Sequence, residues 1–116
     1  MTDHFSKADK KVASTVSDLA LQRDFNRILN ECHELLNKWK IEKPGDKRLT
    51  YGSLYQTIRE NDQYIAGRYD ALSGSRYFNT IVGLLVDEIL SPEDLTGFSS
   101  EARQDLLKMA EHFKNL

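Results

Sequence analysis

The side chains most able to carry out chemistry in this 116-residue chain are its three histidines and its one cysteine. His33 and Glu34 begin like the helix of a zinc protease, a motif that needs a second histidine four residues after the first. Position 37 is Asn, so the motif fails. Cys32 and His33 point about 100° apart on a helix and cannot form a nucleophile–base pair with each other. We therefore expect no catalytic residue, no metal site and no cofactor.

A basic cluster near the middle of the chain is a second candidate site. It surrounds Trp39 and consists of Lys38, Lys40, Lys43, Lys47 and Arg48. Positive charge beside an aromatic ring is the minimum requirement for contacts with phosphates and bases. Glu42 and Asp46 dilute the cluster, and a solvated helix end is the simpler interpretation. A small nucleic-acid-associated protein therefore stays an alternative function.

The segment from Tyr51 to Asp70 is a candidate protein-binding surface. It is rich in tyrosine and arginine, the residues that form hot spots in protein interfaces. The competing interpretation, in which the tyrosines edge the core and keep their hydroxyls in water, is equally open. The candidate partner-binding residues are Tyr51, Tyr55, Arg59, Tyr64, Arg68, Tyr69 and Asp70.

These residues must be positioned by helices, because the apolar residues recur at helical spacing. Residues 4–43 contain no Gly or Pro, which favours one long helix. Its first apolar track is Ala8, Val12, Val16 and Leu19. After a change of phase near Ala20, the spacing alternates between three and four residues, as in a coiled coil. This second track is the candidate dimer seam, formed by Leu21, Phe25, Ile28, Leu29, Cys32, Leu35 and Trp39.

The length of this helix predicts a dimer. A helix of about 30 residues spans about 45 Å, whereas a globule of this size has a radius of about 13 Å. Part of the helix should therefore pack on a second copy of the chain. The phase change makes residues 1–20 a candidate flexible or extended N-terminal arm.

Turn residues divide the rest of the chain into shorter helices. Lys43–Asp46, with its proline and glycine, ends the first helix. Thr50 is a candidate N-cap of the second helix, and Gly67 is its candidate C-terminal stop. The stretch from Arg76 to Leu90 is apolar on most sides, which is typical of a central buried helix.

The C-terminal part carries two further capping signals. Ser91 and Pro92 are typical of the first positions of a short helical turn, and Ser99 is the candidate N-cap of a last helix. We therefore predict an all-α fold, in which a long N-terminal helix joins three to four shorter helices. Residues 1–116 are expected to form a single domain that dimerises.

Composition excludes several broad classes. With 16 basic and 18 acidic residues, the net charge of −2 gives no general attraction to nucleic acid or to an anionic membrane. No apolar run approaches the roughly 20 residues of a membrane span, and the N-terminus lacks the apolar region of a secretory signal. One cysteine cannot form an internal disulfide. We expect a cytoplasmic protein.

The stretch Ile65-Ala66-Gly67-Arg68-Tyr69-Asp70 is followed by an apolar helix and then by Leu90-Ser91-Pro92-Glu93-Asp94-Leu95-Thr96-Gly97. In these motifs, and in the long first helix, the chain resembles the fluorescence recovery protein family. The resemblance implies an all-helical homodimer without a cofactor. It would act on an orange-carotenoid-protein-like partner, detaching it from the light-harvesting antenna and hastening its return to the resting state.

The residues that this family uses for its task differ in this chain. The family has a Trp, a His-Asp pair and an Arg on its second helix, and the matching places here hold Tyr51 or Gly52, Tyr55, Gln56 and Asn61. The leading expectation is a homodimeric regulatory protein that binds a protein partner of unknown identity. Besides the nucleic-acid alternative, an immunity or antitoxin-like inhibitor of a toxic enzyme stays open.

Overall fold

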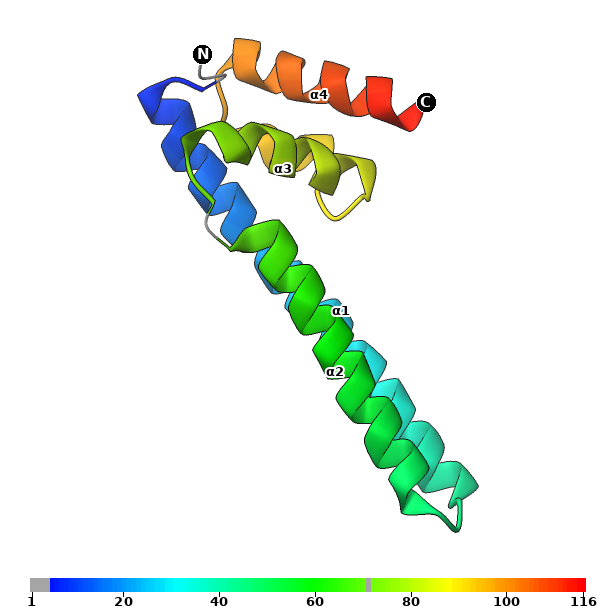
Figure 1. The fold of residues 1–116 in the computed structure, drawn as a ribbon. Coiled ribbons are helices and arrows are strands. Elements are labelled where there is room, and N and C mark those ends of the chain that lie inside the picture. Colours follow the sequence, from blue (N-terminus) through cyan, green and yellow to red (C-terminus); the bar gives the residue numbers. More distant parts are fainter. Residues whose placement is uncertain (1–4, 71) are drawn as a thin grey trace. The chain divides into compact units, whose positions relative to one another are not determined.

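The computed structural model describes residues 5–70 and 72–116. Its elements are α1 (Lys7–Glu42), α2 (Lys47–Tyr69), α3 (Gly74–Val86), the short 3-10 helix η1 (Pro92–Leu95) and α4 (Ser100–Lys114) (Figure 1). These residues form no strand. The predicted all-α class, with a long first helix followed by shorter ones, is confirmed.

The chain divides into two compact units, where the sequence suggested a single domain. The core unit consists of Met1–Gln22 and Ala71–Leu116, and the hairpin unit is Arg23–Asp70. The boundary falls within α1, close to Ala20, where the apolar track changes phase. A helix presents a different face after such a change, so one continuous helix can supply both units.

The core unit is built on α3 and α4, which lie side by side (Figure 1). Ile81 and Leu84 of α3 are fully buried, which confirms α3 as the central apolar helix. Leu106 of α4 is fully buried as well, and so is Leu95 of η1. Phe5 packs against Phe78 and Phe98, with ring centroids 5.6 Å and 5.2 Å apart. The core unit therefore has a conventional apolar interior.

The N-terminal part of α1 belongs to this interior. Residues 7–20 are helical rather than an extended arm, and residues 1–4 lie outside the described part of the chain. The predicted track is partly wrong. Ala8 and Leu19 are exposed, and the buried face carries small residues such as Ala13 and Ala20.

The buried face also holds a carboxylate, Asp9, which explains the shift of the track. Its Oδ1 accepts the backbone N–H of Ser99 at 2.8 Å, and its Oδ2 accepts the Ser99 hydroxyl at 2.7 Å. These bonds, with Ser6 contributing less, hold the pKa of Asp9 below its ordinary value. The bonds join the first turn of α1 to the start of α4.

Two predicted ends of α2 are corrected. The helix begins at Lys47 and is capped by Asp46, whose Oδ1 accepts the Arg48 N–H at 3.0 Å, so Thr50 lies inside it. Aspartate caps as well as threonine does, and it comes first along the chain. Gly67 does not stop the helix, which continues to Tyr69.

The ends of the later helices agree better with the sequence. α3 begins at Gly74 and ends at Val86, four residues before the predicted end, and Glu88 takes a left-handed φ of 62°. Ser91 and Asp94 form a capping box around Pro92, and the Ser99 hydroxyl accepts the Ala102 N–H at 3.3 Å. The predicted caps Ser91 and Ser99 are thus confirmed.

No helix in the described ranges combines the length and the apolar content that crossing a lipid bilayer requires.

Candidate functional site

The hairpin unit consists of the second part of α1 and the antiparallel α2 (Figure 1). Half-buried residues recur on α2 at steps of four and three, which marks the face turned toward α1. The α1 residues turned toward α2 are half-buried in the same way. The members of this inner face include Ile28, Cys32, Leu35 and Trp39 on α1 and Thr50, Leu54, Thr57, Asn61 and Tyr64 on α2.

The most buried group of the inner face is the carboxylate of Asp24, which is 1% exposed. Its Oδ2 accepts the hydroxyl of Tyr69 at 2.6 Å and the hydroxyl of Tyr64 at 2.9 Å. Its Oδ1 accepts the Arg27 Nε–H at 3.4 Å. A buried carboxylate needs such donors because it has left water. Asp24 therefore ties α1 to α2 through two hydroxyls.

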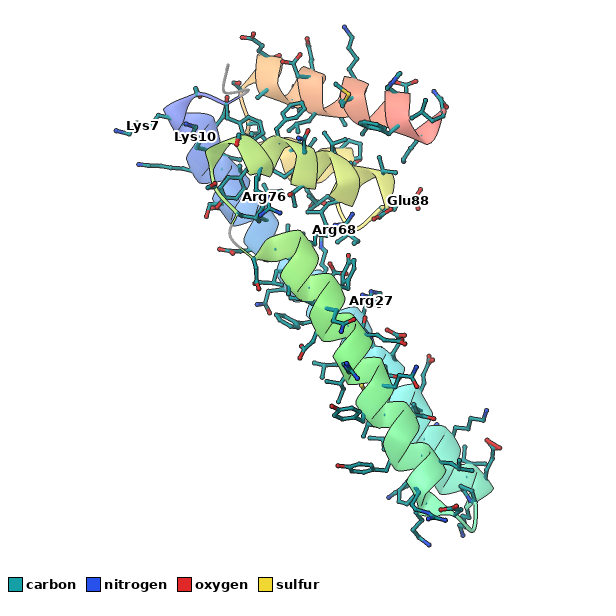
Figure 2. All side chains as sticks on the ribbon, in the orientation of Figure 1. Lys7, Lys10, Arg27, Arg68, Arg76 and Glu88 are labelled. Carbon is teal, nitrogen blue, oxygen red and sulfur yellow. The ribbon has the colours of Figure 1, made fainter. Side chains whose placement is uncertain are left out.

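Two arginines complete this cluster around the ring of Tyr64. Arg68 donates to the Tyr64 hydroxyl at 2.6 Å, and Arg27 donates to the Asn61 side chain at 3.3 Å. Both guanidinium groups lie 5.4 Å from the centre of the Tyr64 ring, a distance that allows a cation–π interaction. Figure 2 shows the two arginines on the hairpin.

The two tyrosine hydroxyls of this cluster stay protonated. Burial raises the pKa of Tyr69, and the bond to Asp24 acts in the same direction. Burial also raises the pKa of Tyr64, although Arg68 opposes the shift. A hydroxyl that donates to a carboxylate loses this bond when it ionises, so the cluster favours the neutral tyrosines. These groups act as fixed donors.

This geometry divides the predicted partner-binding residues into two groups. Tyr64, Arg68 and Tyr69 are turned inward around Asp24. The other members are exposed: Tyr51, Tyr55, Arg59 and Asp70. The sequence pattern did not separate the two groups, because it does not show which face of α2 turns toward α1.

The predicted dimer seam is divided in a similar way. Ile28, Leu35 and Trp39 are half-buried on the inner face, whereas Phe25 is 40% exposed and Leu29 is 68% exposed. Cys32 is half-buried on the inner face as well, and Leu21 lies just inside the core unit. The inner residues contact the chain itself, and the outer ones are left uncovered.

Apart from Ile41 and Leu49, near the loop between the helices, the large exposed apolar residues of the hairpin unit lie on one side of it. Each follows an inner-face position by one residue, which is a rotation of about 100°. Because the helices are antiparallel, equal rotations bring both sets to the same side. We call this side the apolar face, and it consists of Phe25, Leu29 and Leu36 of α1 with Tyr51, Tyr55 and Ile58 of α2.

The register of the hairpin makes the apolar face continuous. It is set by the bond of Asp24 to Tyr64 and the bond of Arg27 to Asn61. In this register Leu29 is level with Ile58, and Leu36 is level with the turn of helix that carries Tyr51 and Tyr55. The constant offset of these residues from the inner face is the sequence signal that joins them.

The opposite side of the hairpin is polar apart from Leu49, which is exposed near the loop between the helices. Ion pairs and hydrogen bonds run along each helix there, as between Arg27 and Glu31 at 2.8 Å and between Gln56 and Glu60 at 3.1 Å. Exposed charges of this kind need no partner, because water solvates them. The contrast identifies the apolar face as the part of the hairpin unit suited to association.

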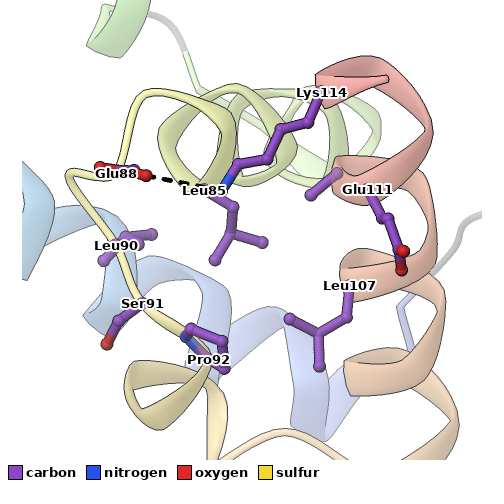
Figure 3. A pocket seen from close by; sticks show the side chains of 9 residues that line it. Leu85, Glu88, Leu90, Ser91, Pro92, Leu107, Glu111 and Lys114 are labelled. Atoms are coloured by element: carbon purple, nitrogen blue, oxygen red, sulfur yellow. Dashed lines mark ion pairs between the residues drawn. The ribbon is translucent and has the colours of Figure 1, made fainter. Parts of the chain in front are cut away.

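The core unit has a cleft of its own, of about 480 Å³, between α3 and α4. Figure 3 shows Leu85, Leu90 and Leu107 along its walls, with Lys114 and Glu88 paired at 3.8 Å. The ion pair is exposed, and the lining holds no buried polar group aimed into the cleft. The cleft therefore has no buried polar group that would select a particular ligand.

In the described part of the chain, no three His, Cys, Asp or Glu side chains come together as a metal site would require. Comparison of the chain with protein-family models, with curated proteins and with solved structures finds no significant match.

Proposed function

We propose that this chain is a non-enzymatic regulatory protein that pairs with a second copy of itself through the apolar face and acts as a dimer on a protein partner. The observation that carries the proposal is the apolar face. It places large side chains from two helices on one side of the hairpin, and Tyr51 is 74% exposed there. A contiguous exposed apolar surface is typical of a protein–protein interface.

A second copy is the favoured occupant because the hairpin unit cannot bury its own apolar residues. Two helices enclose one line of contacts, and most stability of helices in proteins comes from packing an apolar face. Here Tyr69 is the one apolar residue of the unit that reaches burial. Pairing two hairpins face to face would give each a cover of the same shape.

The surfaces left for a partner lie outside the apolar face. Arg59 points away from α1, and Asp70 follows the end of α2, and both are exposed. The resemblance to the fluorescence recovery protein family suggests an orange-carotenoid-protein-like partner. In that case the dimer should hasten the return of such a protein to its resting state after illumination.

The dimer is tested by sedimentation at micromolar concentrations with Leu29→Glu and a matched control, Asn30→Glu. Asn30 is exposed, adjacent in sequence and turned away from α2, so both variants add one negative charge. The unmodified chain and Asn30→Glu should sediment as dimers and Leu29→Glu as a monomer. A compact monomer of the unmodified chain would refute the pairing.

The partner is tested by adding the chain to an illuminated orange carotenoid protein and following its colour. Faster recovery that is lost with Leu29→Glu would support both the partner and the dimer. A recovery rate unchanged by the dimer would remove this partner and leave the pairing standing.

A further inference from the structure

The tip of the hairpin holds a pocket that the proposed function does not use. It has a volume of about 420 Å³ and is lined by Trp39, Lys40, Lys43, Pro44 and Lys47. Three of these five side chains end in an ammonium group, and the other two present an indole ring and a pyrrolidine ring. The pocket is therefore cationic on one part of its wall and apolar on another.

The charges around this pocket are unevenly paired. Glu42 lies 3.8 Å from Lys38, and Asp46 binds Arg48 through two contacts of 3.1 Å. The Arg48 side chain, followed by its backbone N–H, holds the pKa of Asp46 below its ordinary value. Both acids of the tip are thus engaged by bases that do not line the pocket.

The three lysines of the pocket are left with their charge uncompensated. Lys40, Lys43 and Lys47 have no carboxylate within ion-pair distance among the residues that the structure describes. Their like charges repel one another, and an anion between them would relieve this repulsion. The sequence suggested that Glu42 and Asp46 dilute the basic cluster, whereas the geometry concentrates the surplus charge in the pocket.

The composition of the wall selects among anions. Lysine binds phosphate as a point charge, whereas arginine, whose flat fork matches a carboxylate, is occupied at this tip. Trp39 and Pro44 add a surface on which a planar ring can lie, and stacking of a base on an aromatic side chain is a general device of single-strand binding. An aspartate or glutamate side chain has no aromatic ring that could stack on this wall.

We propose that the tip pocket binds a nucleoside phosphate, with its phosphate among Lys40, Lys43 and Lys47 and its base against Trp39 and Pro44. The source is either a free nucleotide or a nucleotide within a single strand. The pocket shares no residue with the apolar face. It would make the protein responsive to a second class of molecule.

Trp39 is the single tryptophan of the chain, so its fluorescence reports on this pocket directly. The titration uses ADP, a short oligothymidylate and polyglutamate, each at low salt. Saturable quenching by ADP would assign a free nucleotide, and quenching by the oligothymidylate alone would assign a single strand. Equal quenching by polyglutamate would show that charge suffices and would overturn the role of the base.

The lysines are tested with the double variant Lys43→Gln/Lys47→Gln against Lys11→Gln, an exposed lysine of the core unit. Each phosphate contact to a single strand adds about 0.7 to the slope of log affinity against log salt. In the double variant two of the three lysines lose their charge, so the slope measured with the oligothymidylate should become less steep. For either source, affinity should drop at least about tenfold and stay unchanged in Lys11→Gln.

Two results would overturn the site. One is the absence of saturable quenching by both ADP and the oligothymidylate at low salt. The other is binding of equal affinity in the double variant and in Lys11→Gln. Lys43 and Lys47 are exposed, and circular dichroism would verify that each variant keeps its helices.

Discussion

The two units are stabilised by different kinds of interaction. In the core unit, three helical elements and the N-terminal stretch of α1 enclose leucine, isoleucine and phenylalanine side chains that are almost wholly buried. In the hairpin unit, the most buried side chains are Asp24 and Tyr69, and they form a polar cluster. The difference shows that four packed elements can enclose apolar groups, whereas two helices need polar bonds or a further partner.

The polar cluster has a cost that an apolar interior does not have. A buried hydrogen-bonded group adds about 1 kcal/mol net, but it leaves a larger penalty when its partner is removed. The pairing of the two hairpin helices therefore depends more on the hydrogen bonds around Asp24 than on burial of apolar surface. Four measurements test this difference between the two units.

The largest effect is expected in the core unit. Leu106→Ala removes a fully buried side chain and leaves a cavity, so it should lower the free energy of unfolding by about 3 kcal/mol. Leu29→Ala, in the hairpin unit, should change it by less than about 0.5 kcal/mol in the monomer, because this side chain is exposed. Denaturant titration followed by circular dichroism, at concentrations below the dimer range, measures both. Similar losses would remove the contrast between the units.

The next effect concerns the polar cluster. Asp24→Ala leaves the hydroxyls of Tyr64 and Tyr69 without their acceptor and should destabilise the hairpin unit by about 2–3 kcal/mol. Tyr69→Phe removes a donor only, so its cost should be about half as large. Trp39 lies in this unit, so its fluorescence reports on the unfolding of the hairpin. An unchanged free energy of unfolding in Asp24→Ala would show that the cluster does not hold the helices together.

The two units should also fail at opposite ends of the pH scale. The pKa of Asp9 is lowered by folding, so its contribution is present above 3.8 and is lost as the pH falls through the folded-state value. The pKa of Tyr69 is raised by folding, so its contribution is complete below 10.0 and declines as the pH rises above that value.

Amide hydrogen exchange in α3 and α2 can follow the two units separately across this range. Asp9→Asn should reduce the acid dependence of the core unit, and Tyr69→Phe should reduce the alkaline dependence of the hairpin unit. The assignment of these groups would be contradicted if α3 and α2 lost their protection from exchange at the same pH in the unmodified chain and in both variants.

The smallest effect is expected at Gly67, which lies inside α2 with open space around the position of a side chain. Gly67→Ala should stabilise the hairpin unit by about 0.5–1 kcal/mol, because alanine is the better helix former. Thermal unfolding would detect the rise. A loss of stability would restore Gly67 as the helix stop that the sequence predicted.

The helices themselves were predictable because their signals are local. The break at Lys43–Asp46, the cap at Ser99 and the apolar run of α3 each lie within a few residues of sequence. Even the unit boundary left a trace, as the change of phase near Ala20. Errors occurred where two local signals competed, as when Asp46 capped α2 ahead of Thr50.

The candidate site was predictable only in part, because it depends on how two helices face each other. Spacing alone could not tell that Tyr69 turns toward Asp24 while Tyr55 turns to solvent, since the partner of Tyr69 is 45 residues away. Nor could it tell which basic side chains the tip acids engage. The dimer and the family relationship stay predictions.

The bonds between Asp9 and Ser99 have a consequence for biosynthesis. Their partners are 90 residues apart, so the core unit is assembled from both ends of the chain around an inserted hairpin. At about 5–20 residues per second, the ribosome needs several seconds to reach Ser99 after Asp9 has emerged. During this time the two helices of the hairpin can pair, whereas the apolar side chains of α3 stay uncovered until α4 has been made. The nascent chain thus completes the hairpin unit first and the core unit last.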